Sequence, residues 1–136
     1  MNIREVMTPN PKYVSPTDSI QNAARIMRDA DTGAVPVVDN GRPIGIVTDR
    51  DIVVRAVAED GQLNRPVRDI VSGNVVCVTP DMSTHEAADL MSEHQIRRLP
   101  VVENGRPIGI VSLGDLALER DPDSCLSDIS AAPPKD

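Results

Sequence analysis

The chain has 136 residues, enough for one ordinary domain or two very small ones, and 40% of them are hydrophobic. Its net charge is −7 and Tyr13 is its only aromatic residue, so the acidic surface repels phosphate backbones, offers bases almost no rings to stack on, and argues against nucleic acid as a partner. No apolar run approaches the ~20 residues of a membrane span, and the charged N-terminus is unlike a secretory signal, so we expect a cytoplasmic protein.

An internal repeat spans most of the chain. The segment PVVDNGRPIGIV at 36–47 returns as PVVENGRPIGIV at 100–111, with eleven of twelve positions identical. A shift of 64 residues aligns 3–51 with 67–115 without a gap and gives 20 identities in 49 positions. An ungapped match of this length indicates a duplication. We expect repeat 1 with a linker over 1–64, repeat 2 over 65–120 and an acidic tail over 121–136.

Each repeat begins with a short apolar strand followed by a helix. Pro16 and Pro80 stop the predicted strands, and Cys77 in the second strand is expected to be a small buried hydrophobe rather than a metal ligand. Apolar residues then recur with helical spacing. Asp18 and Ser83, each with Gln or Glu three residues later, are the predicted N-caps. The expected buried helix positions are Ile20, Ala23, Ala24 and Met27, then Ala87, Ala88, Leu90 and Met91.

The repeated segment itself predicts a β-hairpin. Asn-Gly stands at 40–41 and 104–105, and both residues tolerate the positive φ of a tight turn. Gly45 and Gly109 lie inside the returning strands, where glycine indicates a bulge or the close approach of another group.

A second helix follows each hairpin. Thr48 and Ser112 are the predicted N-caps; Gly61 is expected to end the first helix and Pro122 the second. Each half is therefore β-α-β-β-α and too small to be secure alone. We predict a mixed α/β (α+β) fold in which two pseudo-twofold-related halves pack their small sheets around one shared core. The polar 121–136 segment is expected to be a mobile tail, and the faint likeness of LSDIS at 126–130 to the repeat openings leaves a docking helix open.

These segments resemble the cystathionine β-synthase (CBS) domain. GIVTDRD at 45–51 and GIVSLGD at 109–115 are similar to its G-[IV]-[VI]-[TS]-x-x-D signature. RRLPVV at 97–102 resembles its entry into the second strand, and IREVMTPN and VRDIVSGN resemble its opening. Two copies over 3–118 indicate a tandem pair, or Bateman module, standing alone.

The resemblance implies a regulatory site in the clefts between the repeats, with AMP, ADP, ATP or S-adenosylmethionine as ligand. The family's aspartate, which binds ribose hydroxyls, corresponds to Asp51 and Asp115. Its phosphate-binding Thr or Ser corresponds to Thr48 and Ser112, and its basic pair to Arg97 and Arg98. From the residues themselves, a carboxylate can accept both hydroxyls of a diol, Gly45 and Gly109 can admit a flat ring, and Arg50 can reach a phosphate.

Two alternatives stay open at the site. Thr or Ser with acids in the first helical turn is also ordinary N-cap chemistry. The copies differ too: Gly33-Ala34 replaces the basic pair in repeat 1, and Leu113-Gly114 replaces Asp49-Arg50 in repeat 2. We therefore expect unequal sites, with the ligand favouring Thr48 and Asp51 and Arg98 reaching across the pseudo-twofold.

The predicted function is an adenosyl-ligand sensor that acts on its own assembly or on an unidentified protein partner. The resemblance also implies a homodimer formed through helices, and the apolar run Ile52-Val53-Val54 fits that use. No required cofactor and no metal site are expected, and no enzymatic activity is expected because no nucleophile–base pair accompanies the acids. The alternative is a ligand-independent dimerisation or scaffold module with vestigial clefts.

Overall fold

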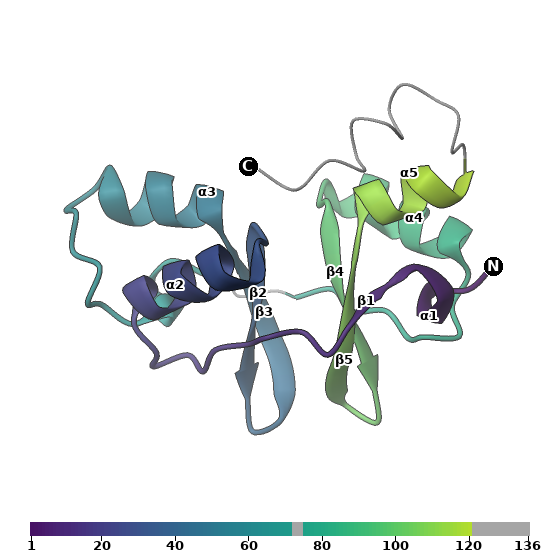
Figure 1. The fold of residues 1–136 in the computed structure, drawn as a ribbon, viewed down its shortest axis with the longest axis horizontal. Helices are drawn as coiled ribbons and strands as arrows, with labels where there is room; N and C mark the ends of the chain where they lie inside the picture. The colour runs from purple at the N-terminus through teal and green to yellow at the C-terminus, as the bar shows by residue number, and fades with distance from the viewer. Residues whose placement is uncertain (72–74, 121–136) are drawn as a thin grey trace. The chain divides into compact units, whose positions relative to one another are not determined.

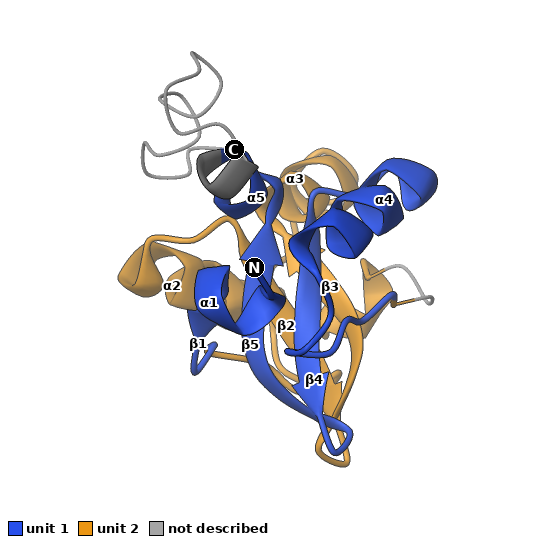
Figure 2. Cartoon of the chain, turned by 90° about the vertical axis from the view of Figure 1, so that its right-hand side faces the viewer, with its two compact units in different colours: residues 1–11, 76–133 blue, residues 12–75, 134–136 orange. Residues whose placement is uncertain are grey.

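A computed structural model describes residues 1–71 and 75–120 (Figure 1). The expectations for the tail, including its docking helix and Pro122, lie outside this part of the chain. The described residues divide into two compact units (Figure 2): residues 1–11 and those from 76 onward form unit 1, and those from 12 to 75 form unit 2. No helix within the described ranges is both long and apolar enough to cross a membrane.

Unit 2 contains repeat 1 from residue 12 through its second helix, together with the opening of repeat 2. Helix α2 (Ile20–Ala30) precedes the hairpin of β2 (Ala34–Asp39) and β3 (Arg42–Thr48), and α3 (Asp49–Ile52) continues as a π-helical turn, Val53–Val57. Gly61, at φ +69°, follows this helix, and its N–H donates to the carbonyl of Ala56 at 2.9 Å, as predicted for a helix end. A 3₁₀ turn, Val67–Asp69, completes the unit.

Unit 1 repeats this plan. Helix α4 (Thr84–His94) precedes the hairpin of β4 (Arg98–Glu103) and β5 (Arg106–Ser112), and α5 (Leu113–Arg120) follows. The N-terminal residues add α1 (Ile3–Val6) and β1 (Thr8–Pro9), which pairs antiparallel with β5 to give the order β1-β5-β4. The sheet of unit 2 has two strands, β2 and β3.

The hairpins form as predicted. Asn40, Gly41, Asn104 and Gly105 all have φ between 53° and 79°, the conformation of a turn in which both central residues have positive φ. The strand register shifts between Val37 and Val38 and between Val101 and Val102, directly beside the partners of Gly45 and Gly109. The glycines therefore stand at β-bulges, one of the two features that their position predicted.

The first strand of each half is reduced to a single bridge. Val14 pairs in parallel with Val37, and Val78 with Val101, and no longer ladder forms at either place. The N–H of Val14 donates to the carbonyl of Pro36 at 3.0 Å, and its carbonyl accepts from Val38 at 2.8 Å. A proline two residues after each valine turns the chain away, which explains why the pairing stops there.

The N-caps correct one prediction. Ser83 caps α4, accepting a hydrogen bond from the N–H of Glu86 at 3.1 Å, as expected. In α2 the cap is Ser19, which accepts from Asn22 at 3.0 Å, and not Asp18. The Asp18 carboxylate instead accepts from the N–H of Ser15 at 2.9 Å and closes the preceding turn. Ser19 and Ser83 are equivalent under the 64-residue shift, so both repeats cap at the same position.

Buried residues form two clusters, one in each unit, where the sequence predicted one shared core. In each unit the cluster combines residues of the small sheet with residues of that unit's helices. The cluster of unit 2 contains Val14, Ile20, Ala23, Met27, Val35, Val37, Val47, Ile52, Ala56, Val67 and Ile70. That of unit 1 contains Ile3, Val78, Ala87, Met91, Leu99, Val101, Val111 and Leu116. Ala24, Ala88 and Leu90 are partly buried against these clusters, and Cys77 is half-buried.

The opening segment of each repeat packs into the core of the other. Ile3, which opens repeat 1, is fully buried in unit 1, and its N–H donates to the carbonyl of Met82 at 2.9 Å. Val67, which opens repeat 2, is fully buried in unit 2, and its N–H donates to the carbonyl of Asp18 at 2.8 Å. The exchange is symmetric, since both donors and both acceptors are 64 residues apart.

Candidate functional site

The predicted hydroxyl and carboxylate pairs lie where the hairpin's second strand meets the following helix. In unit 2 the N–H of Thr48 donates to Asp51 Oδ2 at 2.9 Å, and the N–H of Asp51 donates to Thr48 Oγ1 at 3.1 Å. In unit 1 Ser112 and Asp115 make the same two bonds at 2.8 and 3.1 Å. Each pair is a reciprocal capping box, so the N-cap interpretation of these residues holds in both repeats.

The capping boxes leave part of each carboxylate unused. A carboxylate has about four lone-pair positions, and the box occupies one of them. The side chain of Asp51 is 22% exposed, so solvent or a ligand can reach it. The arrangement is therefore compatible with further hydrogen-bond donors, and the cap fixes the direction in which the carboxylate points.

Asp115 is partly desolvated. Burial raises the pKa of its carboxyl group, against the opposing effects of the Ser112 hydrogen bonds and the charge of Arg98. Arg98 is the first residue of β4 and pairs with Ser112 in the strand register, which accounts for its position near Asp115. Arg97 is exposed, and its carbonyl accepts from the N–H of Leu113 at 2.8 Å. The basic pair is thus brought to Ser112 and Asp115 of its own unit, and its reach toward Asp51 stays a prediction.

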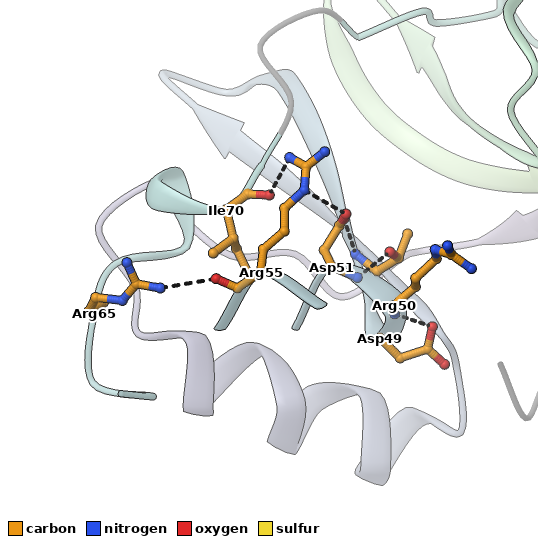
Figure 3. Close-up of polar contacts among 7 residues, drawn as sticks. Asp49, Arg50, Asp51, Arg55, Arg65 and Ile70 are labelled. Carbon is orange, nitrogen blue, oxygen red and sulfur yellow. Dashed lines mark hydrogen bonds and ion pairs between the residues drawn. The ribbon is translucent and has the colours of Figure 1, made fainter. Parts of the chain in front are cut away.

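Arg50 lies in the first turn of α3 and is exposed. Its N–H donates to Asp49 Oδ1 at 2.8 Å, so Asp49 closes a local turn while the guanidinium remains at the surface (Figure 3). Arg50 is therefore an exposed cation directly before Asp51 in the chain. Its contact with a phosphate stays a prediction.

Gly109 has a structural reason to be glycine. A Cβ there would lie 2.5 Å from Met7 Sδ and 2.9 Å from the carbonyl oxygen of Thr8. The close approach expected at this position is thus made by the N-terminal segment that forms β1. Gly45 is buried opposite Val37 in β3. A role for either glycine toward a ligand stays a prediction.

Arg55 was not singled out from the sequence, yet it contacts the candidate site. Its Nε lies 4.0 Å from Asp51 Oδ1, and its Nη1 donates to the carbonyl of Ile70 at 3.2 Å (Figure 3). The available signal was the spacing, because an acid and an arginine four residues apart on a helix are neighbours. Repeat 2 has Glu119 at the equivalent position, so Arg55 is not among the residues that the two repeats share.

A surface cavity of about 460 Å³ lies elsewhere in unit 1 and contains none of the predicted site residues. Within it Arg4 Nη2 and Glu103 Oε2 form an ion pair at 2.9 Å, and the Thr79 hydroxyl lowers the pKa of the exposed Asp81 carboxyl. Its lining residues are Asn2, Arg4, Thr79, Pro80, Asp81, Val102, Glu103, Asn104 and Gly105. In the described part of the chain no three His, Cys, Asp or Glu side chains gather as a metal site would require.

Comparison with known proteins identifies two matching segments. Residues 3–57 and 67–120 each match the CBS domain. The CBS domain-containing protein YhcV of Bacillus subtilis is 42% identical over 119 residues, covering 88% of this chain and 85% of that protein. Among solved structures, the CBS-domain containing protein ATU1752 from Agrobacterium tumefaciens is 33% identical with a TM-score of 0.78, covering 88% and 99% of the two chains.

A second solved structure was determined with ligands. The CBS domain pair of protein MJ0100, in complex with 5′-methylthioadenosine and S-adenosyl-L-methionine, is 26% identical to this chain with a TM-score of 0.81. The match covers 91% of this chain and 98% of that one. The fold predicted from the repeat, a tandem pair with small antiparallel sheets and flanking helices, is confirmed.

Proposed function

Because the chain belongs to the CBS domain family, we propose that it is a regulatory module that binds an adenosyl ligand and passes its occupancy to an assembly or a protein partner. The observation that carries the proposal is the ordered, partly exposed carboxylate of Asp51, fixed by Thr48 with lone pairs to spare. A vicinal diol supplies two donors to such a group. The CBS pair of MJ0100, with its two adenosyl ligands, supports the same ligand class.

The proposal assigns residues to the parts of the ligand. Asp51 and Asp115 accept the ribose hydroxyls. Thr48 and Ser112 contact the phosphate and orient these two carboxylates through the capping boxes. Arg50 in repeat 1 and the pair Arg97–Arg98 in repeat 2 face the phosphate of a nucleotide such as AMP, ADP or ATP, or the carboxylate of S-adenosylmethionine. No cofactor is required and no chemical step is assigned, since the module senses its ligand without converting it.

Assembly is the proposed output. Val53, Val54 and Val57, here called the valine patch, are 58%, 49% and 54% exposed, although they follow the buried Ile52 directly. A small module rarely leaves three adjacent large apolar side chains in water. We assign the patch to a homodimer formed through these helices, with an unidentified protein as a second candidate for the same surface.

One observation favours a second function, a scaffold that needs no ligand. Both hydroxyl–carboxylate pairs are already closed into capping boxes, which explains the residues as helix caps alone. Under this alternative the module dimerises through the valine patch and its acids have no ligand.

A thermal-shift panel of AMP, ADP, ATP, S-adenosylmethionine and NAD separates the two functions. A ligand at 100 times its Kd stabilises the folded state by about 2.7 kcal/mol and raises Tm by several degrees. The sensor predicts a saturable rise with at least one adenosyl compound. A flat response to the whole panel supports the scaffold and contradicts the sensor.

A further inference from the structure

Arg55 connects the Asp51 carboxylate to a distant part of the sequence. It lies in the π-helical turn Val53–Val57 directly after α3, a distortion that is often found at functional sites. From there its Nε lies 4.0 Å from Asp51 Oδ1, and its Nη1 donates to the carbonyl of Ile70 at 3.2 Å (Figure 3). A single guanidinium therefore contacts the candidate ligand site at one end and the opening of repeat 2 at the other.

The carbonyl of Ile70 is a fixed anchor. The side chains of Val67 and Ile70 are buried in the core of unit 2, at 0% and 1% exposure. The backbone there is held by Val67 N–H to Asp18 at 2.8 Å and by Arg68 N–H to Pro16 at 3.1 Å. Arg55 is thus oriented by a rigid acceptor, which is how a neighbouring residue fixes the geometry of a site.

The main chain of Arg55 is held as well. Its carbonyl, near the end of the helix, accepts a hydrogen bond from Arg65 Nη2 at 3.3 Å. Arg65 Nε lies 3.6 Å from Asp60 Oδ2, and its Nη1 lies 3.9 Å from Asp69 Oδ2. The side chain and the main chain of Arg55 therefore both hydrogen-bond to residues in the range 65–70, so a shift of the helix turn that carries Arg55 would change those bonds.

The two repeats differ at this point. The Asp51 carboxylate accepts one hydrogen bond, from Thr48 N–H to Oδ2. The Arg55 guanidinium lies beside Oδ1 as an ion-pair partner at 4.0 Å, so roughly three of the four lone-pair positions remain and a vicinal diol needs two. In repeat 2 the residue equivalent to Arg55 is Glu119, an acid like Asp115. The arrangement of Asp51 has no counterpart there.

We propose that Arg55 is the positioning residue of an adenosyl site at Asp51, and that it makes the Val67–Ile70 segment a structural part of that site. The inference rests on the proposed function and deepens it in two ways. It assigns the tighter diol-binding site to repeat 1. It also identifies Val67–Ile70 as the segment that responds when the ligand binds at Asp51.

Calorimetric titration with adenosine and with 2′,3′-dideoxyadenosine tests the positioning role. Arg55→Gln should weaken adenosine binding roughly fivefold and leave 2′,3′-dideoxyadenosine unchanged, because only the diol uses the oriented carboxylate. Arg55→Lys should recover part of the loss, since an ammonium keeps the charge but lacks the fork that reaches both acceptors. In an Asp51→Asn background, Arg55→Gln should have no further effect on adenosine. Arg28→Gln, which removes an exposed ion pair to Asp29 at 2.8 Å, is the matched control.

The outcomes separate the inference from the function on which it rests. Equal losses for both nucleosides, or additive losses in the Asp51→Asn background, mean a merely structural role and overturn the inference. An adenosine affinity that Arg55→Gln leaves at the wild-type value overturns the inference about Arg55 but not the proposed adenosyl-binding function. No binding of adenosine by the wild type overturns both.

Hydrogen exchange tests the coupling to the segment. Adenosine should slow exchange of the Ile70 N–H, which donates to Val67 at 3.0 Å, in the wild type but not in Arg55→Gln. If adenosine does not change the exchange rate of the Ile70 amide in the wild type, or slows it equally in both proteins, the proposed coupling between Asp51 and this segment is refuted.

Discussion

Replacing Gly109 by alanine places a methyl group where the N-terminal strand crosses β5. The new Cβ would lie 2.5 Å from Met7 Sδ and 2.9 Å from the Thr8 carbonyl oxygen, both closer than such contacts allow. The methionine side chain can turn aside, but the Thr8 oxygen is backbone and β1 must shift with it. Overpacking of this kind costs about 1–3 kcal/mol.

An opposing contribution comes from the unfolded chain. Gly→Ala at a strand position without backbone strain stabilises by about 0.4–1 kcal/mol, since alanine has less conformational freedom to lose. The net expectation for Gly109→Ala is a loss of about 1–2 kcal/mol in the free energy of unfolding, measured with urea.

Hydrogen exchange locates the effect of Gly109→Ala. The amide of Asn10 donates to the Ile108 carbonyl at 3.1 Å, so its protection should fall more than that of Val78, whose amide donates to Pro100 at 3.0 Å. The double variant Met7→Ala with Gly109→Ala should show a partial interaction energy, because only the sulfur clash is relieved. A Gly109→Ala protein that is more stable than the wild type, with unchanged Asn10 protection, would refute the docking of residues 1–11 on this hairpin.

Three further changes test separate parts of the structure. Thr48→Ala should lower the free energy of unfolding by about 1 kcal/mol in urea titrations, with Ser112→Ala giving a similar loss; no loss in either would contradict the capping boxes. Burial raises the pKa of Asp115, so the folded chain binds its proton more tightly than the unfolded chain, and wild-type stability should fall relative to Asp115→Asn as pH rises from about 4 through the raised pKa. Urea titrations of both proteins across that range check the sign, and a constant difference would contradict it. Val54→Asp should reduce the molar mass measured by sedimentation equilibrium to that of a monomer. An unchanged mass would contradict the assignment of the valine patch to the dimer interface.

The sequence predicted the parts of this fold whose causes are local. Asn-Gly turns, the bulges beside Gly45 and Gly109, and the caps at Thr48 and Ser112 depend on residues within a few positions of each other. The prediction of Asp18 as the cap of α2 is wrong because the neighbouring Ser19 is an equally good cap residue and the Asp18 carboxylate accepts from the N–H of Ser15 instead.

The exchange of the opening segments could not be read from the repeat. A period of 64 residues shows that Ile3 and Val67 are equivalent, but it does not say which copy each one packs against. Since the two cores are built alike, either copy offers an apolar pocket for either segment. Arg55 was not predicted as a site residue because it occurs in one repeat only. The equivalent residue in repeat 2 is Glu119, and an argument from the duplication favours residues that both repeats share.

The central claim is that the Asp51 carboxylate holds the ligand, and calorimetry of Asp51→Ala tests it most directly. The titrant is the adenosyl compound that gives the largest thermal shift, and Asp51→Ala is compared with the wild type and with Thr48→Ala, which loses the cap but keeps the carboxylate. Hydrogen bonds to a charged group contribute about 1.5–3 kcal/mol each, so Asp51→Ala should weaken binding at least tenfold. An affinity unchanged by Asp51→Ala would contradict the assignment.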